Sequence, residues 1–205
     1  MFITFEGIDG AGKSTQASML SEYLSGKYKA EVVLTHEPGG WEGGGLLREM
    51  ARGGALKHRW SEAFLFMLDR CEHITQVISP SVQKGKTVLC DRYHDSTLAY
   101  QVWGRGLPLR VFDALADMVN FPVPDVTLFF DAPISSALAR ASLRSRPDAF
   151  EKEGIAFMKR VREGYITLAE REPDRWVIIN CGGDSAAEIF EKALTALSMK
   201  GFFSD

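Results

Sequence analysis

A glycine-rich loop near the N-terminus constrains the fold of this 205-residue chain more than any other feature. Residues 7–14 read GIDGAGKS and fit the pattern G-x-x-x-x-G-K-[ST] without mismatch. A strand-like run at residues 2–5 precedes the loop, and a stretch with helical periodicity follows it. Glycines let backbone N–H groups curl around a phosphate, and the helix directs its positive end at the anion. The pattern therefore predicts a loop that binds a nucleoside triphosphate.

Two side chains of the loop have predicted chemical roles. Lys13 can reach the β- and γ-phosphates, and the hydroxyl of Ser14 can ligate Mg²⁺. A nucleoside triphosphate and Mg²⁺ are thus expected at this loop. The residues predicted to bind ATP at the loop are Gly7, Ile8, Asp9, Gly10, Ala11, Gly12, Lys13, Ser14 and Thr15.

Short apolar runs alternate with helical patterns along the whole chain. The other strand-like runs are residues 32–35, 87–90, 126–130 and 176–179, and their near-continuous apolar character predicts strands buried on both faces. Apolar stripes predict helices around residues 17–24, 64–77, 155–168 and 185–197; Ser61 is the expected N-cap of the second, and Ser185 with Glu188 forms a capping-box pattern in the last. Loops are expected at 39–60, 101–109 and 142–152. We predict one α/β domain over residues 1–205, with a five-stranded parallel sheet flanked by helices.

Charge and composition exclude several classes of protein. With 24 Lys and Arg against 27 Asp and Glu, the net charge of −3 disfavours coating of nucleic acid or anionic membranes. The apolar runs are too short to span a bilayer, and no basic leader or secretory signal is visible. Three cysteines without paired spacing are typical of free thiols in the cytoplasm, and the four histidines lack metal-ligand spacing.

Two further patterns indicate a phosphotransferase. Asp91 and Arg92 follow a buried strand, where a carboxylate can hold Mg²⁺ and an arginine can clamp a phosphate. Phe66 and Arg70 share one helix face, and their spacing suits stacking on a nucleobase and hydrogen bonding to it. No N-K-x-D motif of a regulatory GTPase occurs. A turn-rich segment at about 140–152, the predicted lid over ATP, carries Arg140, Arg144 and Arg146.

The chain resembles the bacterial thymidylate kinase (dTMP kinase) family almost from end to end. The motifs that carry the resemblance are FEGIDGAGKST, THEPGG, FLFMLDR, LCDRYHDSTLAYQ, GRGLP, VPDVTLFFD and FMKRVREGYITLA. The resemblance implies a P-loop nucleotide kinase with a short lid that transfers the γ-phosphoryl group of MgATP to dTMP, giving dTDP and ADP for dTTP biosynthesis. It also implies a homodimer.

Matching positions imply roles for individual residues. Asp9 resembles the acid that contacts the deoxyribose 3′-hydroxyl, and Tyr100 resembles the ring that disfavours a 2′-hydroxyl. The implied catalytic residues are Lys13, Asp91, Arg92, Arg144 and Arg146, with Ser14 and Asp91 as metal ligands and Arg140 near ATP. The implied dTMP-binding residues are Asp9, Glu37, Pro38, Arg48, Phe66, Arg70, Arg92, Ser96, Tyr100 and Gln101.

The chain departs from the family pattern at four places. His36 and Ala149 stand where arginines are usual, residues 41–45 are richer in glycine, and residues 102–103 replace two glycines. Arg146 is a hypothetical substitute for the arginine missing at 149. Two alternatives stay open: a kinase of another pyrimidine nucleotide or of a deoxynucleoside, and an ATP-binding regulatory module without catalysis.

Overall fold

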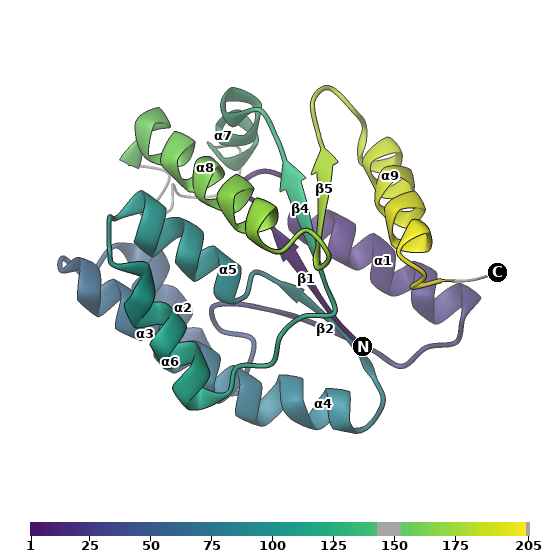
Figure 1. Cartoon of the computed structure of the whole chain (residues 1–205), viewed down its shortest axis with the longest axis horizontal. Helices are drawn as coiled ribbons and strands as arrows, with labels where there is room; N and C mark the ends of the chain where they lie inside the picture. The colour runs from purple at the N-terminus through teal and green to yellow at the C-terminus, as the bar shows by residue number, and fades with distance from the viewer. Residues whose placement is uncertain (143–152, 204–205) are drawn as a thin grey trace.

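The computed structural model describes residues 1–142 and 153–203. Its five strands form one parallel sheet in the order β2-β3-β1-β4-β5 (Figure 1). The strands are β1 (Phe2–Glu6), β2 (Val32–His36), β3 (Thr87–Asp91), β4 (Val126–Asp131) and β5 (Trp176–Asn180). The predicted parallel α/β sheet is confirmed, and each strand continues one residue further toward its carboxyl end than its apolar run.

Helices cover both faces of the sheet. α1 (Lys13–Lys27) and α9 (Ala186–Met199) lie together on one face, whereas α3 (Arg59–His73), α5 (His94–Thr97), the π-helical η2 (Leu98–Gly104) and α8 (Ile155–Arg171) lie on the other (Figure 1). This division follows from right-handed crossovers: the chain moves one way across the sheet from β1 to β2 and the opposite way in every later crossover. The other helical elements are α2 (Gly44–Gly53), η1 (Ile74–Ile78), α4 (Ser79–Gln83), α6 (Leu109–Val119) and α7 (Ile134–Ser142).

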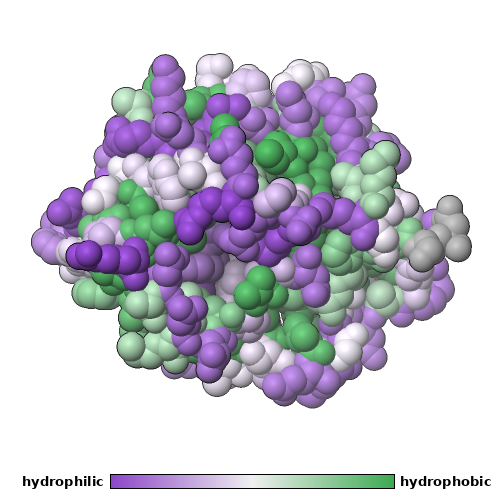
Figure 2. All heavy atoms as spheres, in the orientation of Figure 1, coloured by the Kyte–Doolittle hydropathy of each residue, from purple (hydrophilic) through white to green (hydrophobic). Residues whose placement is uncertain are grey.

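The central and edge strands differ in burial. β1 is buried throughout, and β3 and β4 are buried except for their last residues. On the edge strands, Leu34 of β2 and Ile178 of β5 are about half exposed. The prediction of burial on both faces thus holds for the three central strands only. On the face drawn in Figure 2, hydrophobic side chains gather in separate patches among hydrophilic ones. Within the described residues, no helix has the length and apolar character that crossing a membrane needs.

Helix α3 differs most from its prediction. It begins at Arg59 with His58 as the N-cap, not at Ser61, and the helical path continues through η1 and α4 beyond Pro80. Pro80 is tolerated because it lies in the first turn of α4. The predicted apolar stripe is wrong in part, since Phe64 and Leu68 are 56% and 52% exposed.

The predicted loops also contain more helix than expected. Residues 39–60 include α2 and the start of α3, and residues 101–104 belong to η2. Arg140 lies in α7, and residues 143–152 of the predicted lid lie outside the described residues. The capping box of Ser185 and Glu188 is confirmed at the start of α9.

Candidate active site

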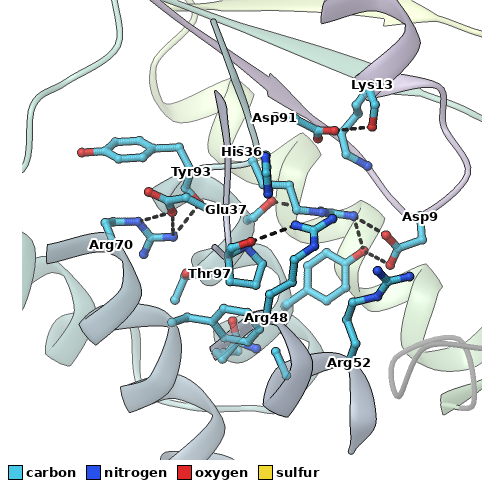
Figure 3. A pocket seen from close by; sticks show the side chains of 18 of the residues that line it. Asp9, Lys13, His36, Glu37, Arg48, Arg52, Arg70, Asp91, Tyr93 and Thr97 are labelled. Carbon is cyan, nitrogen blue, oxygen red and sulfur yellow. Dashed lines mark hydrogen bonds and ion pairs between the residues drawn. The ribbon is translucent and has the colours of Figure 1, made fainter. Parts of the chain in front are cut away.

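A cavity opens at the carboxyl edge of the sheet, where ligands bind in open α/β folds (Figure 3). β1 leads into the phosphate loop at this edge, β2 leads into Glu37, and β3 ends at Asp91. Helices α2 and α3 and the segment α5–η2 supply the remaining walls. The predicted residues that line the cavity are Asp9, Gly10, Gly12, Lys13, Ser14, Glu37, Pro38, Arg48, Phe66, Arg70, Asp91, Arg92, Ser96, Tyr100 and Gln101.

The phosphate loop has a backbone that only glycine adopts readily. Gly10 and Gly12 have φ angles of 81° and 100°, and a Cβ on Gly10 would overlap the carbonyl of Ala137. The loop ends where α1 begins, so the first turn of that helix points at the cavity. Arg140 of α7 holds the loop from outside, because its Nε donates to the Gly10 carbonyl over 2.8 Å.

Lys13 is buried at the start of α1, and its Nζ donates to the Ile8 carbonyl over 3.0 Å. Burial, and then the nearby Arg92 charge, lower the pKa of Lys13 to about 8, against the opposing effect of Asp91 and Asp9. The amine is therefore poised beside the loop and would be stabilised as an ammonium by a bound anion.

Ser14 and Asp91 lie together as a metal site requires. The Ser14 hydroxyl donates a hydrogen bond to Asp91 Oδ2, and the buried Oδ1 of Asp91 has no hydrogen-bond partner among the described residues. A hydroxyl and a carboxylate with one unsatisfied oxygen are oxygen ligands of the kind that Mg²⁺ prefers. The residues present thus fit the predicted metal.

Arg92 and Asp9 form an ion pair across the cavity. Arg92 Nη2 lies 2.6 Å from Asp9 Oδ1, and the Tyr100 hydroxyl donates to Asp9 Oδ2 over 3.1 Å. Partial burial raises the pKa of Asp9, but the Arg92 and Lys13 charges outweigh it and bring that pKa down to about 2. Tyr100 also places its ring 5.1 Å from the guanidinium. Both members of the pair are charged at neutral pH.

A second, fully buried network holds Arg70. Its Nη2 lies 2.7 Å from Glu37 Oε2 and donates to the Tyr93 carbonyl over 2.9 Å. The other oxygen of Glu37 contacts His73 Nδ1 at 3.0 Å, and His73 Nε2 contacts the Thr35 hydroxyl at 2.7 Å. Glu37, His73 and Cys90 bring possible metal ligands within 4.8 Å of one another. Since both nitrogens of His73 are engaged, we interpret the set as a hydrogen-bond network.

Other predicted residues have partners that the sequence pattern does not reveal. Arg48 Nη1 donates to the Pro38 carbonyl over 2.8 Å, and Gln101 Nε2 donates to Glu62 over 3.0 Å. Ser96, assigned by resemblance to the thymine side, has its hydroxyl bonded to Glu6 and Arg92.

Some predicted residues do not line the cavity, and some lining residues were missed. Gly7, Ile8, Ala11, Thr15 and Arg140 lie along the loop or behind it, and Arg144 and Arg146 lie outside the described residues. The lining residues without an assigned role are His36, Ala51, Arg52, Tyr93, Thr97 and Ala141.

For two of these missed residues, the sequence contains a pattern that could have identified them. Arg52 follows Arg48 by one helical turn, which places both on one face of α2. His36 ends β2 at the ligand-binding edge. Burial, and then Arg48, lower the pKa of His36, so this residue does not supply the positive charge of an arginine at neutral pH.

Three comparisons with known proteins give one and the same family. A family model described as thymidylate kinase matches residues 5–191. The thymidylate kinase of Desulfovibrio desulfuricans is 46% identical over 191 residues, covering 88% of this chain and 87% of that protein. That of Anaplasma marginale is 43% identical over 197 residues, covering 93% and 90%. The crystal structure of thymidylate kinase from Ehrlichia chaffeensis has a TM-score of 0.80 at 35% identity and covers 97% of this chain and 98% of its own.

Proposed function

The chain belongs to the thymidylate kinase family, and from that premise we propose that it transfers the γ-phosphoryl group of MgATP to dTMP, giving dTDP and ADP in dTTP biosynthesis. The observation that carries this proposal is the cavity itself, which has a phosphate loop at one end and Arg70 toward the other (Figure 3), with Arg92 paired to Asp9 of the loop. We treat residues 1–205 as one kinase domain because the five strands form a single sheet.

ATP binds at the phosphate loop in this proposal. The loop amides and the first turn of α1 surround the β-phosphate, and Lys13 contacts the β- and γ-phosphates. Ser14 and Asp91 hold Mg²⁺, which when bound neutralises charge on the β- and γ-phosphates. The roles near ATP of Arg140, and of Arg144 and Arg146 beyond the described residues, stay predictions.

dTMP binds at the other end of the cavity. Arg92 and Arg48 contact its phosphate, since both side chains line the cavity. Phe66 stacks on the thymine and Arg70 hydrogen-bonds to its edge, held in place by Glu37. Asp9 and Tyr100 face the deoxyribose, and Pro38, Ser96 and Gln101 complete the wall.

The chemistry needs charge stabilisation and alignment more than a base. The acceptor phosphate is already anionic, so its oxygen can attack the γ-phosphorus in line without losing a proton to the enzyme. Although burial acts against it, the Asp9 carboxylate raises the pKa of Arg92 well above its ordinary value. Arg92 therefore keeps its charge beside the negatively charged transition state.

A homodimer is part of the proposal. Phe64 and Leu68 lie one helical turn apart on α3 with 56% and 52% of their surface exposed, and Met118 of α6 is 77% exposed. Trp60 stacks on both Phe64 of α3 and Phe112 of α6, so the two helices are neighbours. An apolar helix face of this kind suits burial against a second copy of the chain. Sedimentation of a Phe64→Glu, Leu68→Glu variant tests it: a wild-type dimer with a monomeric variant supports the dimer, and a monomeric wild type contradicts it.

A cytoplasmic location completes the proposal. It is supported by three cysteines that form no disulfide.

A substrate panel tests the activity. ADP release is measured with ATP and, in turn, dTMP, dUMP, dCMP, UMP, AMP and thymidine. Preference for dTMP supports the proposal, since Arg92 selects a phosphorylated acceptor and Arg70 a pyrimidine. Preference for another acceptor, or ATP binding without turnover of any acceptor, would contradict it.

A further inference from the structure

One carboxylate beneath the site has no role so far. Glu6, the last residue of β1, is fully buried and is not among the residues that line the cavity. A buried carboxylate requires hydrogen-bond donors, and this one has three. Its Oε1 accepts from the Tyr93 amide over 2.8 Å, and its Oε2 accepts from the Ser96 hydroxyl over 2.5 Å and the Tyr165 hydroxyl over 3.1 Å.

The first of these bonds fixes the backbone at Arg92. Arg92 has a φ of 73°, a left-handed conformation that is unfavourable for a non-glycine residue. The peptide groups on both sides are held, because the Arg92 amide donates to the Phe5 carbonyl over 3.0 Å and the Tyr93 amide donates to Glu6. Glu6 thus stabilises the turn that directs Arg92 from the end of β3 into the cavity.

The other two bonds orient the acceptors of the Arg92 side chain. Arg92 Nη1 donates to the Ser96 hydroxyl over 3.0 Å and to the Tyr165 hydroxyl over 3.3 Å. Each hydroxyl has a single proton, and Ser96 and Tyr165 also contact each other at 2.8 Å. An ionised Glu6 can only accept hydrogen bonds, so it draws both protons toward itself and leaves oxygen lone pairs of the two hydroxyls for the guanidinium. A protonated Glu6 would donate to one hydroxyl and disturb this arrangement.

We propose that Glu6, in its ionised form, is a positioning residue that holds both the backbone and the guanidinium of Arg92 for binding of the acceptor phosphate. The inference rests on the proposed function, because it takes Arg92 as the residue that clamps the phosphate of dTMP. Glu6 itself contacts neither nucleotide, and its effect passes entirely through Arg92, Ser96 and Tyr165.

The ionisation of Glu6 falls in an accessible pH range. Burial, and then the Asp95 carboxylate, raise the pKa of Glu6 to about 7, whereas the Ser96 hydrogen bond, the Arg92 charge and the Tyr93 amide oppose the rise. Asp95 is itself paired with Arg175 at 2.7 Å. The titratable and charged groups that act on Glu6 from the surrounding elements are Lys13, Arg70, Cys90, Arg92, Tyr93, Asp95 and Tyr165.

Steady-state kinetics of Glu6→Gln across the pH range from acid to alkaline test the proposal. Because the glutamine amide resembles the protonated acid, we expect the KM for dTMP to rise about tenfold and the KM for ATP to change less than about twofold. In wild type, protonation of Glu6 should contribute to the fall of kcat/KM for dTMP at acid pH. Glu6→Gln should remove this contribution, which has a pKa near that of Glu6. The second ionisation of dTMP lies in the same range, at about pH 6, so the comparison is always with wild type under identical conditions.

Asp95→Asn is the matched control, since it changes a neighbouring buried carboxylate that has no bond to Arg92. It should leave the dTMP KM at high pH unchanged and move the acid-side fall to lower pH, because removing the Asp95 charge lowers the pKa of Glu6. A structural role alone would move neither pH profile. Ser96→Ala, which keeps Glu6 but removes the hydroxyl between it and Arg92, should also raise the dTMP KM selectively.

A folded Glu6→Gln with an unchanged dTMP KM and an unchanged acid-side fall would overturn the proposal. If Glu6→Gln does not fold, an unchanged dTMP KM in Ser96→Ala overturns it instead. Failure of the underlying function is recognised separately, because wild type would then not phosphorylate dTMP, or Arg92→Ala would bind dTMP as wild type does.

Discussion

The two ends of the cavity are built in different ways. The donor end consists of consecutive residues, 7–14, and its binding groups are mainly backbone amides of a loop shaped by glycines. The acceptor end consists of side chains from the segments that follow β2 and β3 and from α2, α3, α5 and η2, which meet only in the folded chain. Two of its arginines depend on acids: the buried Arg70 on Glu37, and the partly buried Arg92 on Asp9.

Because of this difference, we expect substitutions at the two ends to have different effects on activity and on stability. At the donor end, the one hydrogen bond of Lys13 Nζ to a described residue is to a backbone carbonyl of its own loop, so its removal affects bound phosphate more than the fold. At the acceptor end, Arg70 is also part of the buried structure, so a change to it or to its partner acid alters binding and stability together. Substitutions at the two ends of the cavity test this contrast between donor and acceptor end.

Removal of the Lys13 ammonium should have the largest effect. Lys13→Ala is expected to lower kcat by about 10³-fold or more, because the transferring phosphoryl group loses a positioned charge. Thermal unfolding should show little change in Tm. The control is Lys27→Ala at the opposite end of α1, which should retain full activity. Near-normal turnover of Lys13→Ala would show that the loop does not bind the transferring phosphate.

Loss of the Glu37 charge, unlike loss of the Lys13 ammonium, should lower stability as well as weaken binding. Glu37→Gln leaves Arg70 as a buried cation without a counter-ion, so the free energy of unfolding should fall by about 3 kcal/mol and the dTMP KM should rise about tenfold. Urea unfolding and kinetics measure the two effects. Glu31→Gln is the matched control, since it removes an ion pair with Lys86 that is exposed to solvent and therefore contributes little to stability. Equal losses of stability in the two variants would contradict the contrast.

The same contrast explains what could be predicted from the sequence. The five strands, the phosphate loop and the capping box at Ser185 depend on neighbouring residues, and all three were predicted. Helix α3 was also predicted, but its buried face was not, because the apolar pattern placed Phe64 and Leu68 inside, whereas the buried face carries Arg70 and His73.

The burial of these polar residues depends on a distant partner. Glu37 bonds to both Arg70 and His73, and it lies 33 and 36 residues away from them in the chain. No periodicity within α3 contains that information. The sequence nevertheless identified Arg70 as a binding residue, because its spacing from Phe66 and the resemblance to a family both indicated it.

Binding of ATP should show the titration of Lys13. In the free enzyme the pKa of Lys13 is about 8, and a bound polyanion raises it, so a proton is taken up on binding above that pH. ATP affinity should therefore fall as pH rises, by up to about tenfold from about pH 7 to pH 9. Calorimetry in buffers of different ionisation enthalpy measures the uptake directly. Lys13→Arg is the control, because guanidinium stays charged throughout this range. A wild-type affinity that is flat across pH 8 would contradict the prediction.

The smallest expected effect concerns Arg52, which extends the acceptor end to its exposed rim. Its side chain lines the cavity one helical turn after Arg48, is exposed, and has no hydrogen bond or ion pair with any described residue. A cation of this kind attracts phosphate through solvent, so Arg52→Leu should raise the dTMP KM about threefold at low salt and less at high salt. Stability should not change, since no buried partner is left unpaired.

Arg171→Leu makes the same substitution on an exposed arginine of α8 outside the cavity, and it should leave the KM unchanged. If the two variants have identical kinetics at low salt, Arg52 does not contribute to dTMP binding, and the acceptor end contains only arginines that have partners. A salt-dependent effect of Arg52→Leu alone would instead show that binding and stability separate at the rim of the acceptor end, as they do at the donor end. In that case, an arginine couples binding to stability when it has a buried partner acid, whichever end of the cavity it lies at.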